Sequence, residues 1–168
     1  MGAHGIAGKW NMSGESIRVP MMIYDPRLPK SVSGTRSQTA LNIDLTAIVM
    51  DLAGVPAPHM DGISLMPILK DTTAEGREEW YYLHDVYTRG KGNPLPNCEG
   101  IRGERWKYIH YRTTDPVQEE LFDIKADPKE MNDLSSNPEY FVILKKLRAR
   151  NEAYKAHLDK AAEGRTLK

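Results

Sequence analysis

Cysteine is nearly absent from this sequence of 168 residues, and long apolar runs are missing altogether. The one cysteine, Cys98, has no internal partner, so the fold must be stabilised by packing, and cysteine usage does not reveal a redox compartment. No apolar stretch reaches the roughly 20 residues that a membrane-spanning helix needs, and the N-terminus has no basic region followed by an apolar run. We therefore expect a soluble chain without a membrane partner.

An excess of charge of either sign is also missing, because 23 lysines and arginines balance 23 aspartates and glutamates. Without a global field the chain has no general attraction for nucleic acid or for an anionic membrane, and we expect neither as a partner. Hydrophobic residues still make up 40% of the sequence, which is enough for a core. The length suits one domain, or one subdomain with part of another.

The first half of the sequence has the pattern of an α/β layer. Residues 19–24 are almost uniformly apolar, as in a short strand that is covered on both faces, and a polar loop follows over residues 27–40. Asn42 then predicts the start of a helix that Gly54 terminates. The helix would bury a face at three- and four-residue spacing, formed by Leu45, Ile48, Val49 and Leu52.

The second half predicts a small antiparallel sheet followed by a helix. A polar stretch at residues 71–79 marks a domain boundary, and beyond it strands rich in aromatic and β-branched residues are expected at residues 80–83, 101–104, 106–111 and 119–124. Asn137 and Pro138 predict the start of a long helix. Its apolar stripe is formed by Tyr140, Leu144, Leu147, Tyr154 and Leu158. The fold class is therefore α/β in the wider sense, or α+β.

Several motifs occur in a characteristic order along the chain. The N-terminal part contains HGIAGKW at residues 4–10, ESIRVP at 15–20 and YDP at 24–26; the C-terminal part contains GIRGERWKYI at 100–109, ELFDI at 120–124 and EMNDL at 130–134. In order and spacing this series resembles the C-terminal part of the sulfatases. The resemblance implies that residues 1–75 contain the last strand and helix of the sulfatase α/β domain. Residues 76–168 would form the C-terminal subdomain, a small antiparallel sheet packed on a long helix.

The features that the sulfatases carry upstream of the Gly-Lys segment are missing from this sequence. The family makes formylglycine from a cysteine in Cys-x-(Pro/Ala/Ser)-x-Arg and binds calcium through Asp, Asn or His side chains. Cys98 has an arginine at the right offset but glycine at the third position, so we reject it as the nucleophile. His59 and Asp61 are too few ligands for a metal, and we assign no metal site. Calcium and formylglycine are expected in the complete family enzyme, and no cofactor in this chain.

The resemblance makes Lys9 the candidate catalytic residue, because the lysine of the family's Gly-Lys segment reaches the sulfate group. A compact ammonium suits the neutralisation of sulfate oxygens. His4 and His84 are candidate substrate-binding residues, and the loop at residues 89–98 is expected to shape the pocket. The alternatives are a surface lysine for Lys9, a histidine near a disordered terminus for His4, and a strand-end histidine satisfied by Asp85 for His84.

Three functions follow from these observations. The first is the C-terminal fragment of a sulfatase that hydrolyses a sulfated small molecule or glycan, with the chain inert by itself. The second is a non-catalytic module that binds a sulfated ligand or completes another chain, and the third is a phosphonate or phosphate ester hydrolase of the same superfamily, that of the alkaline phosphatases. Sulfatases are often exported, to the periplasm, the cell exterior or the lysosome, but the sequence leaves the compartment open. The orphan strand at residues 19–24 would face water or lead to self-association.

Overall fold

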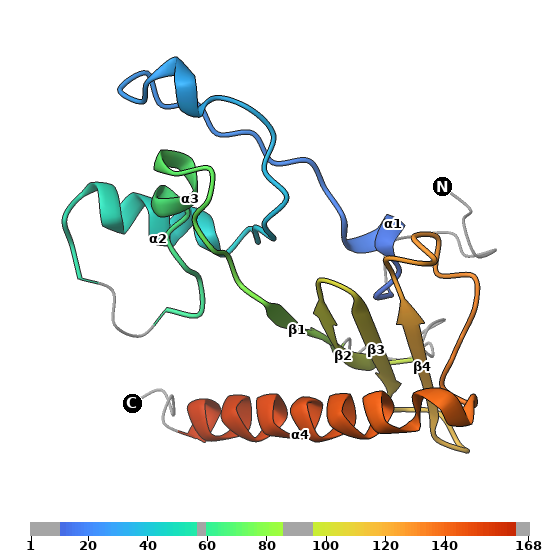
Figure 1. Cartoon of the computed structure of the whole chain (residues 1–168). Coiled ribbons are helices and arrows are strands. Elements are labelled where there is room, and N and C mark those ends of the chain that lie inside the picture. The colour runs from blue at the N-terminus through green and yellow to red at the C-terminus, as the bar shows by residue number, and fades with distance from the viewer. Residues whose placement is uncertain (1–10, 57–59, 86–95, 164–168) are drawn as a thin grey trace. The chain divides into compact units, whose positions relative to one another are not determined.

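The computed structural model describes residues 11–56, 60–85 and 96–163 (Figure 1). The described chain forms two compact units. Unit 1 contains residues 11–18 together with the chain from Glu79 onward, and unit 2 contains Val19–Glu78. The boundary after residue 78 falls within the polar stretch of the sequence. In contrast, residues 11–18 belong with the later sheet by their contacts, whereas the sequence assigned them to the preceding α/β domain.

The sheet of unit 1 is an antiparallel meander in the order β1-β2-β3-β4, which confirms the predicted arrangement. The strands are β1 (Glu79–His84), β2 (Cys98–Gly103), β3 (Trp106–Tyr111) and β4 (Gln118–Asp123). Cys98 is opposite both His84 of β1 and Tyr111 of β3, so these three residues share one face of the sheet. With the long helix that follows, the fold is α+β.

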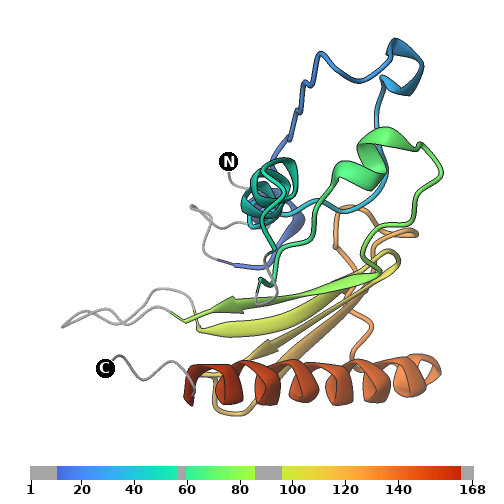
Figure 2. The same ribbon diagram turned by 90° about the vertical axis from the view of Figure 1, so that its left-hand side faces the viewer.

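The helix α4 (Phe141–Glu163) lies along one face of this sheet (Figure 2). A single turn of 3-10 helix, η3 (Pro138–Tyr140), precedes it, and the Asn137 side chain accepts a hydrogen bond from the Glu139 amide at 3.0 Å, as its predicted capping role requires. Leu144 and Leu147 of α4 pack into a core with residues of the facing strands, namely Ile101, Tyr108 and Leu121. Burial of this stripe joins the helix to the sheet.

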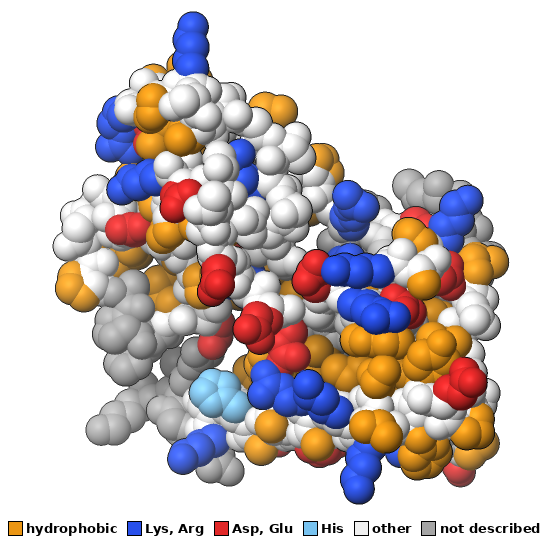
Figure 3. Space-filling model, in the orientation of Figure 1, with side chains coloured by type: hydrophobic (Ala, Val, Ile, Leu, Met, Phe, Trp, Pro, Cys, Tyr) orange, Lys and Arg blue, Asp and Glu red, His pale blue; other side chains and the backbone are white. Residues whose placement is uncertain are grey.

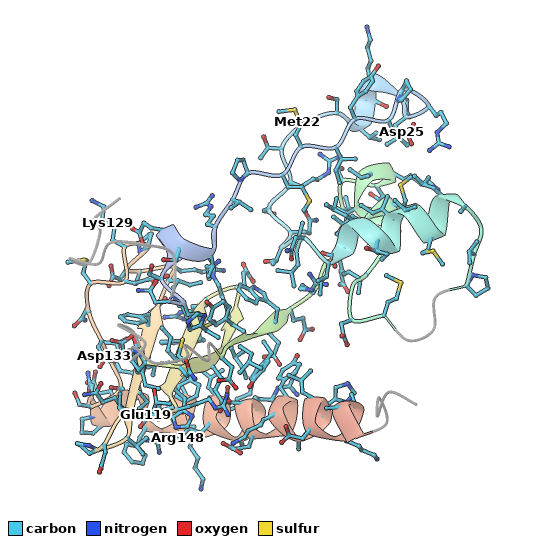
Figure 4. All side chains as sticks on the ribbon, turned by 180° about the vertical axis from the view of Figure 1, so that it is seen from behind. Met22, Asp25, Glu119, Lys129, Asp133 and Arg148 are labelled. Carbon is cyan, nitrogen blue, oxygen red and sulfur yellow. The ribbon has the colours of Figure 1, made fainter. Side chains whose placement is uncertain are left out.

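Two ion pairs add to the contact between α4 and the sheet. Arg148 donates to Glu119 of β4, and Arg150 donates to Glu79 of β1. Figure 4 labels the Arg148 and Glu119 side chains. Basic and acidic side chains accordingly lie next to one another along the helix in the space-filling view (Figure 3). The basic residues of α4 are thus used partly in intramolecular pairs.

The opposite face of the sheet is covered by the N-terminal segment of the described chain. Met12 is completely buried there, in a core with Cys98, Ile109 and Phe122, and the short helix α1 (Gly14–Ile17) follows it. Ile17 packs against the same core. Unit 1 therefore has an apolar core on each side of its sheet.

Unit 2 contains α2 (Asp44–Leu52), α3 (Met66–Lys70) and the 3-10 turn η2 (Lys30–Val32). The prediction of a strand at residues 19–24 is wrong for this structure: the segment is extended but pairs with no strand, and Met22 and Tyr24 are 95% and 85% exposed. Figure 4 labels Met22 on this segment. A strand needs a neighbour for its backbone groups, and no such neighbour is present among the described residues of unit 2.

The helix α2 differs from the prediction at its start and agrees with it at its end. Ile43 precedes the first turn and provides no side-chain cap, so the predicted capping role of Asn42 is wrong. The Asp44 carboxylate accepts a hydrogen bond from the Leu41 amide instead, at 2.7 Å. Gly54 has a φ of +66° just after the helix, the left-handed conformation that a C-terminal glycine provides. Across the described parts of both units, no helix has the length and hydropathy needed to cross a bilayer.

Candidate functional site

Several residues that the sequence proposed for the site lie outside the described residues. These are Lys9 and His4, together with most of the loop at residues 89–98; His59, which was rejected as a metal ligand, also lies outside them. The structure does show where the chain leads directly after Lys9, and it describes His84. The site is therefore described from residues 11–18, the sheet face that they cover and the loop at Glu130 that contacts them.

Met12 attaches this segment to the sheet. Its side chain lies over Gly100 of β2, where an added Cβ would be 2.7 Å from the Met12 sulfur and 2.2 Å from the Tyr108 carbonyl oxygen. Any larger residue at position 100 would displace either the methionine or strand β3. Glycine inside a strand is thus explained by the close approach of the N-terminal segment.

A buried ion pair fixes the same segment two residues further on. Lys107 of β3 is completely buried, and its Nζ donates to Glu130 Oε2 at 2.6 Å. The same carboxylate oxygen accepts a hydrogen bond from the Gly14 backbone N–H at 3.0 Å. Burial lowers the pKa of Lys107, and the hydrogen bond to Glu130 offsets part of this effect. The pair thereby joins the sheet, the loop at residue 130 and the N-terminal segment.

Further polar contacts order the turn between these two points of attachment. Asn11 Oδ1 accepts hydrogen bonds from the hydroxyl groups of Ser13 and Ser16, at 2.9 and 2.6 Å. Such side-chain bonding typically fixes the chain at the start of a helix. Residues 11–16 are therefore held by packing, by an ion pair and by local hydrogen bonds.

His84 lies at the end of β1, on the sheet face that Met12 covers, because it is opposite the buried Cys98. Its neighbour Asp85 accepts hydrogen bonds from Asn97 and Arg112, at 2.7 and 3.0 Å. The geometry places His84 on the same side of the sheet as the segment that follows Lys9. Its role in substrate binding stays a prediction.

Cys98 is poorly suited to nucleophilic chemistry. Its side chain is completely buried, and burial raises the pKa of the thiol to about 11. Because the thiolate is the reactive species, a thiol with this pKa is protonated at neutral pH. The sequence-based rejection of Cys98 as the nucleophile agrees with its environment.

A polar cluster that could not be predicted from the sequence lies on the α4 side of the sheet. Glu99 is 1% exposed, and its carboxylate contacts Tyr81 Oη at 3.0 Å, His110 Nδ1 at 3.2 Å and Asn151 Nδ2 at 2.8 Å. Burial, the largest influence, would raise the pKa of Glu99, but the hydrogen bonds outweigh it and the pKa lies below the ordinary value. The cluster joins β1, β2, β3 and α4, so its role is structural.

Unit 2 has a buried carboxylate of its own. Asp44 is completely buried and accepts two hydrogen bonds from Arg77, both at 2.8 Å, and one from the Ile63 amide at 2.9 Å. An open depression of about 310 Å³ lies elsewhere in this unit. It is lined mainly by apolar residues, among them Ile23, Ile48, Leu52, Met66 and Leu69. Neither feature presents a cluster of groups for acid–base or nucleophilic chemistry.

The described residues do not fit a calcium ion or a formylglycine. Within residues 11–56, 60–85 and 96–163, no group of three or more His, Cys, Asp or Glu side chains is arranged to hold a metal. Calcium requires six to eight oxygen ligands. The cysteine that would have to become formylglycine is the buried Cys98, so we derive no step through either group.

Comparison with protein families gives one match, and it covers most of the chain. Residues 2–157 match the family described as "N-sulphoglucosamine sulphohydrolase, C-terminal". An N-acetylglucosamine-6-O-sulfatase from Bacteroides thetaiotaomicron is 35% identical over 144 residues, which are 83% of this chain and 25% of that protein. The chain thus spans only 25% and 30% of the length of the first two curated relatives.

Solved structures agree with this match. A structure of BT4656 in complex with its substrate D-glucosamine-2-N,6-O-disulfate superposes with a TM-score of 0.59 at 31% identity, covering 70% of this chain and 24% of the other. A phosphonate monoester hydrolase of Agrobacterium radiobacter superposes with a TM-score of 0.55 at 26% identity, covering 68% and 24%. The similarity therefore extends to the two kinds of ester hydrolase that the sequence suggested.

Proposed function

Because this chain belongs to the N-sulphoglucosamine sulphohydrolase C-terminal family of the sulfatases, we propose that it forms the C-terminal part of an enzyme that hydrolyses sulfate esters. One observation carries the proposal: the segment after the Gly-Lys motif is built into the core of the C-terminal sheet through Met12. The motif that the resemblance assigns to sulfate binding is thus continuous with a fixed part of the structure. By itself the chain would bind or orient a substrate without turning it over.

Lys9 has the central role in this proposal. Its ammonium would neutralise oxygens of the sulfate group, and it would contribute most where negative charge develops as the ester bond breaks. His4 and His84 would contact the sulfate or the group that carries it. In the complete family enzyme formylglycine supplies the nucleophile and calcium the positive charge, but this chain's described residues hold neither.

A sulfated sugar is the substrate class that the relatives favour. The sulfatase from B. thetaiotaomicron takes its name from N-acetylglucosamine 6-O-sulfate, and the BT4656 structure contains a disulfated glucosamine. We propose a sulfated amino sugar or glycan for the complete enzyme. Export of that enzyme, to a compartment where such glycans occur, is part of the same proposal.

The direct test is sulfate release by a complete sulfatase that carries this chain as its C-terminal part. The parent should hydrolyse a sulfated glucosamine, and Lys9→Ala should reduce kcat/KM about a hundredfold or more, the usual result of losing a contact that strengthens in the transition state. Lys129→Ala removes an exposed lysine of the same chain and is the matched control. A Lys9→Ala enzyme within a few-fold of the parent would exclude the assigned role.

A second candidate activity is phosphonate ester hydrolysis, favoured by the similarity to the A. radiobacter enzyme. Sulfate and phosphonate esters both need positive groups on the transferred oxygens, so the role proposed for Lys9 suits either. Assaying one enzyme with matched p-nitrophenyl sulfate and phenylphosphonate esters distinguishes them. A higher kcat/KM for the phosphonate would reverse our assignment. Tight binding of a sulfated sugar without hydrolysis of either ester would indicate the non-catalytic module.

A further inference from the structure

We propose that Lys107 and Glu130 are positioning residues for Lys9, and that their buried pair fixes the segment after the Gly-Lys motif onto the sheet. The inference rests on the proposed function, because these residues would act on the substrate only through Lys9. Both lie far from the motif in the sequence, on a strand and in a loop of the C-terminal subdomain. Neither is exposed enough to contact a substrate directly.

The contacts of Glu130 support this role. One carboxylate oxygen joins the Lys107 ammonium at 2.6 Å to the Gly14 amide at 3.0 Å. Gly14 is closely fitted to this carboxylate, because a Cβ there would be 3.1 Å from Glu130 Oε1. A side chain at position 14 would therefore crowd the carboxylate that holds the segment.

The backbone of Glu130 supplies an independent observation. Its φ is +56°, a left-handed conformation that is unfavourable for a residue with a Cβ. The residue at this position is nevertheless a glutamate and not a glycine. The loop is held in this shape from Asp127, whose carboxylate accepts hydrogen bonds from the Met131 and Asn132 amides at 2.6 and 2.8 Å. Strained backbone of this kind persists where surrounding contacts enforce it, and it is a reason to look for a function. The function that the contacts indicate is to present a carboxylate to Lys107 and Gly14.

Stability alone does not explain a buried ion pair at this position. Lys107 lies on the sheet face of Ile109 and Phe122. An apolar side chain there would pack without the cost of removing a charged group from water. Replacing a buried pair by apolar residues of similar volume is often neutral or stabilising. What an apolar pair would not provide is an acceptor for the Gly14 amide, which is the contact that fixes the N-terminal segment.

Chain geometry connects this contact to Lys9. The Cα atoms of residues 9 and 12 are separated by three peptide units, so they are at most about 11 Å apart, and Met12 is fixed in the core. With Met12 and Gly14 both attached to the sheet, the chain from residue 12 onward has little freedom. Releasing Gly14 leaves Met12 as the main attachment, so Met12 is held less firmly, and any movement of Met12 widens the range of positions that Lys9 can sample.

The first experiment measures amide exchange in the full chain. Lys107→Met/Glu130→Met removes both charges and the acceptor together, so no unpaired charge is left in the core. We expect at least tenfold faster exchange for the amides of residues 12–17, with β3 and β4 unchanged. The matched control is Lys125→Met/Glu104→Met, which removes an exposed ion pair of the same unit. Unchanged exchange at residues 12–17 in the Lys107/Glu130 variant would overturn the inference.

The second experiment measures kcat/KM in the complete enzyme. The Lys107/Glu130 double variant should reduce kcat/KM at least tenfold in a parent background and by less than threefold in a Lys9→Ala background. This non-additivity is the result that a general loss of stability would not give. Equal losses in both backgrounds would contradict a positioning role. An inactive parent would instead count against the proposed function, while the exchange experiment would still decide whether the pair fixes the segment.

A single substitution covers the case in which the double variant does not fold. Met12→Ala leaves the ion pair intact and removes the other attachment of the segment. It should also accelerate exchange at residues 12–17, and its effect on kcat/KM should likewise disappear in the Lys9→Ala background. If Met12→Ala reduces kcat/KM equally with and without Lys9, attachment of this segment does not position the lysine.

Discussion

Unit 1 and unit 2 come from one chain, but they differ in how completely they bury their apolar residues. Unit 1 has a core on each side of its sheet, one closed by α4 and the other by Met12 and its neighbours. Unit 2 has a single small core and leaves large apolar side chains exposed, as its orange surface shows (Figure 3). These are Val19, Met21, Met22, Tyr24, Ile43, Leu45, Val49, Leu52, Val55 and Ile63, whereas fewer are exposed in unit 1, namely Leu83, Val117, Met131, Phe141 and Val142. The comparison indicates that unit 1 completes its own fold, whereas unit 2 has the surface of a layer that other elements cover.

Both units use buried carboxylates to join distant parts of the chain, and one from each can be compared. Asp44 in unit 2 joins Arg77 to two loop amides. Glu99 in unit 1 joins three strands to α4. Because unit 2 has less apolar burial, its carboxylate should contribute a larger share of its stability. The predictions below test this difference, from the largest expected effect to the smallest.

Asp44→Ala should unfold unit 2 and leave unit 1 intact. The substitution leaves Arg77 without its buried partner, and breaking a buried pair in this way costs about 3–5 kcal/mol. Limited proteolysis should then cut within residues 19–78 while β1 to α4 stay protected. The control is Asp25→Ala, which removes an exposed ion pair of the same unit and should not change the digest. Simultaneous cleavage throughout both units would show that they do not unfold separately.

Leu121→Ala and Leu45→Ala compare the same truncation in the two units. Leu121 is completely buried and Leu45 is 48% exposed. The first should lower the free energy of unfolding of unit 1 by about 2–5 kcal/mol because it leaves a cavity. The second should change stability by less than about 0.5 kcal/mol, as surface substitutions do. Urea titration followed by the tryptophan fluorescence of unit 1 gives the first value, and comparable losses for the two variants would refute the difference in burial.

Glu99→Gln should weaken the acid sensitivity of unit 1. The folded-state pKa of Glu99 lies below the ordinary 4.5, so its stabilisation is fully present above that pH and is lost as the pH falls through the folded-state value. The wild-type chain should therefore lose stability of unit 1 as the pH falls below 4.5, and the variant should lose less over the same range. Circular dichroism at a series of pH values measures this. The same pH dependence in both chains would show that other carboxylates dominate acid unfolding.

Substitution of exposed apolar residues in unit 2 should have the smallest effect on stability. Met22→Ser/Val49→Ser/Leu52→Ser changes side chains that are largely outside the core, so the free energy of unfolding should hardly change. If the exposed surface causes self-association, the variant should sediment as a monomer at concentrations where the parent does not. The parent sedimenting as a monomer would instead show that this surface stays exposed to water.

Elements with strong local patterns could be predicted from the sequence. The alternating aromatic and β-branched residues of 106–111 gave the bounds of β3, and Asn137 with Pro138 gave the start of the final helical segment. Strand β2 was predicted three residues late, because Glu99 and Gly100 have low strand propensity. The contacts that explain these two residues in a strand come from distant parts of the chain. Met12 occupies the space over Gly100, and Asn151 donates a hydrogen bond to Glu99.

The strand predicted at residues 19–24 and the pair of Lys107 with Glu130 illustrate two further limits. An apolar run forms a strand only if a neighbouring strand can pair with it, and the described residues of unit 2 contain no strand. Lys107 and Ile109 are two residues apart in β3 and therefore share one face of the strand. A lysine on an apolar face was the one sequence pattern that could have indicated its burial. Its partner is 23 residues away in a loop without periodicity, so no sequence pattern could identify it. Lys9, His4 and His84 as site residues stay predictions.

The attachment of Met12 has a consequence for the order of events during synthesis. Its core partner Phe122 follows roughly a hundred residues later, and at 5–20 residues per second the ribosome adds that length in about 5–20 seconds. During this time Met12 has no core to enter, while unit 2 has already left the ribosome. A folded unit 2 shortens the effective loop between residues 18 and 79, which lowers the entropy cost of bringing the two parts of unit 1 together. Folding of unit 2 before the sheet is complete would therefore make the closure of unit 1 less costly in entropy.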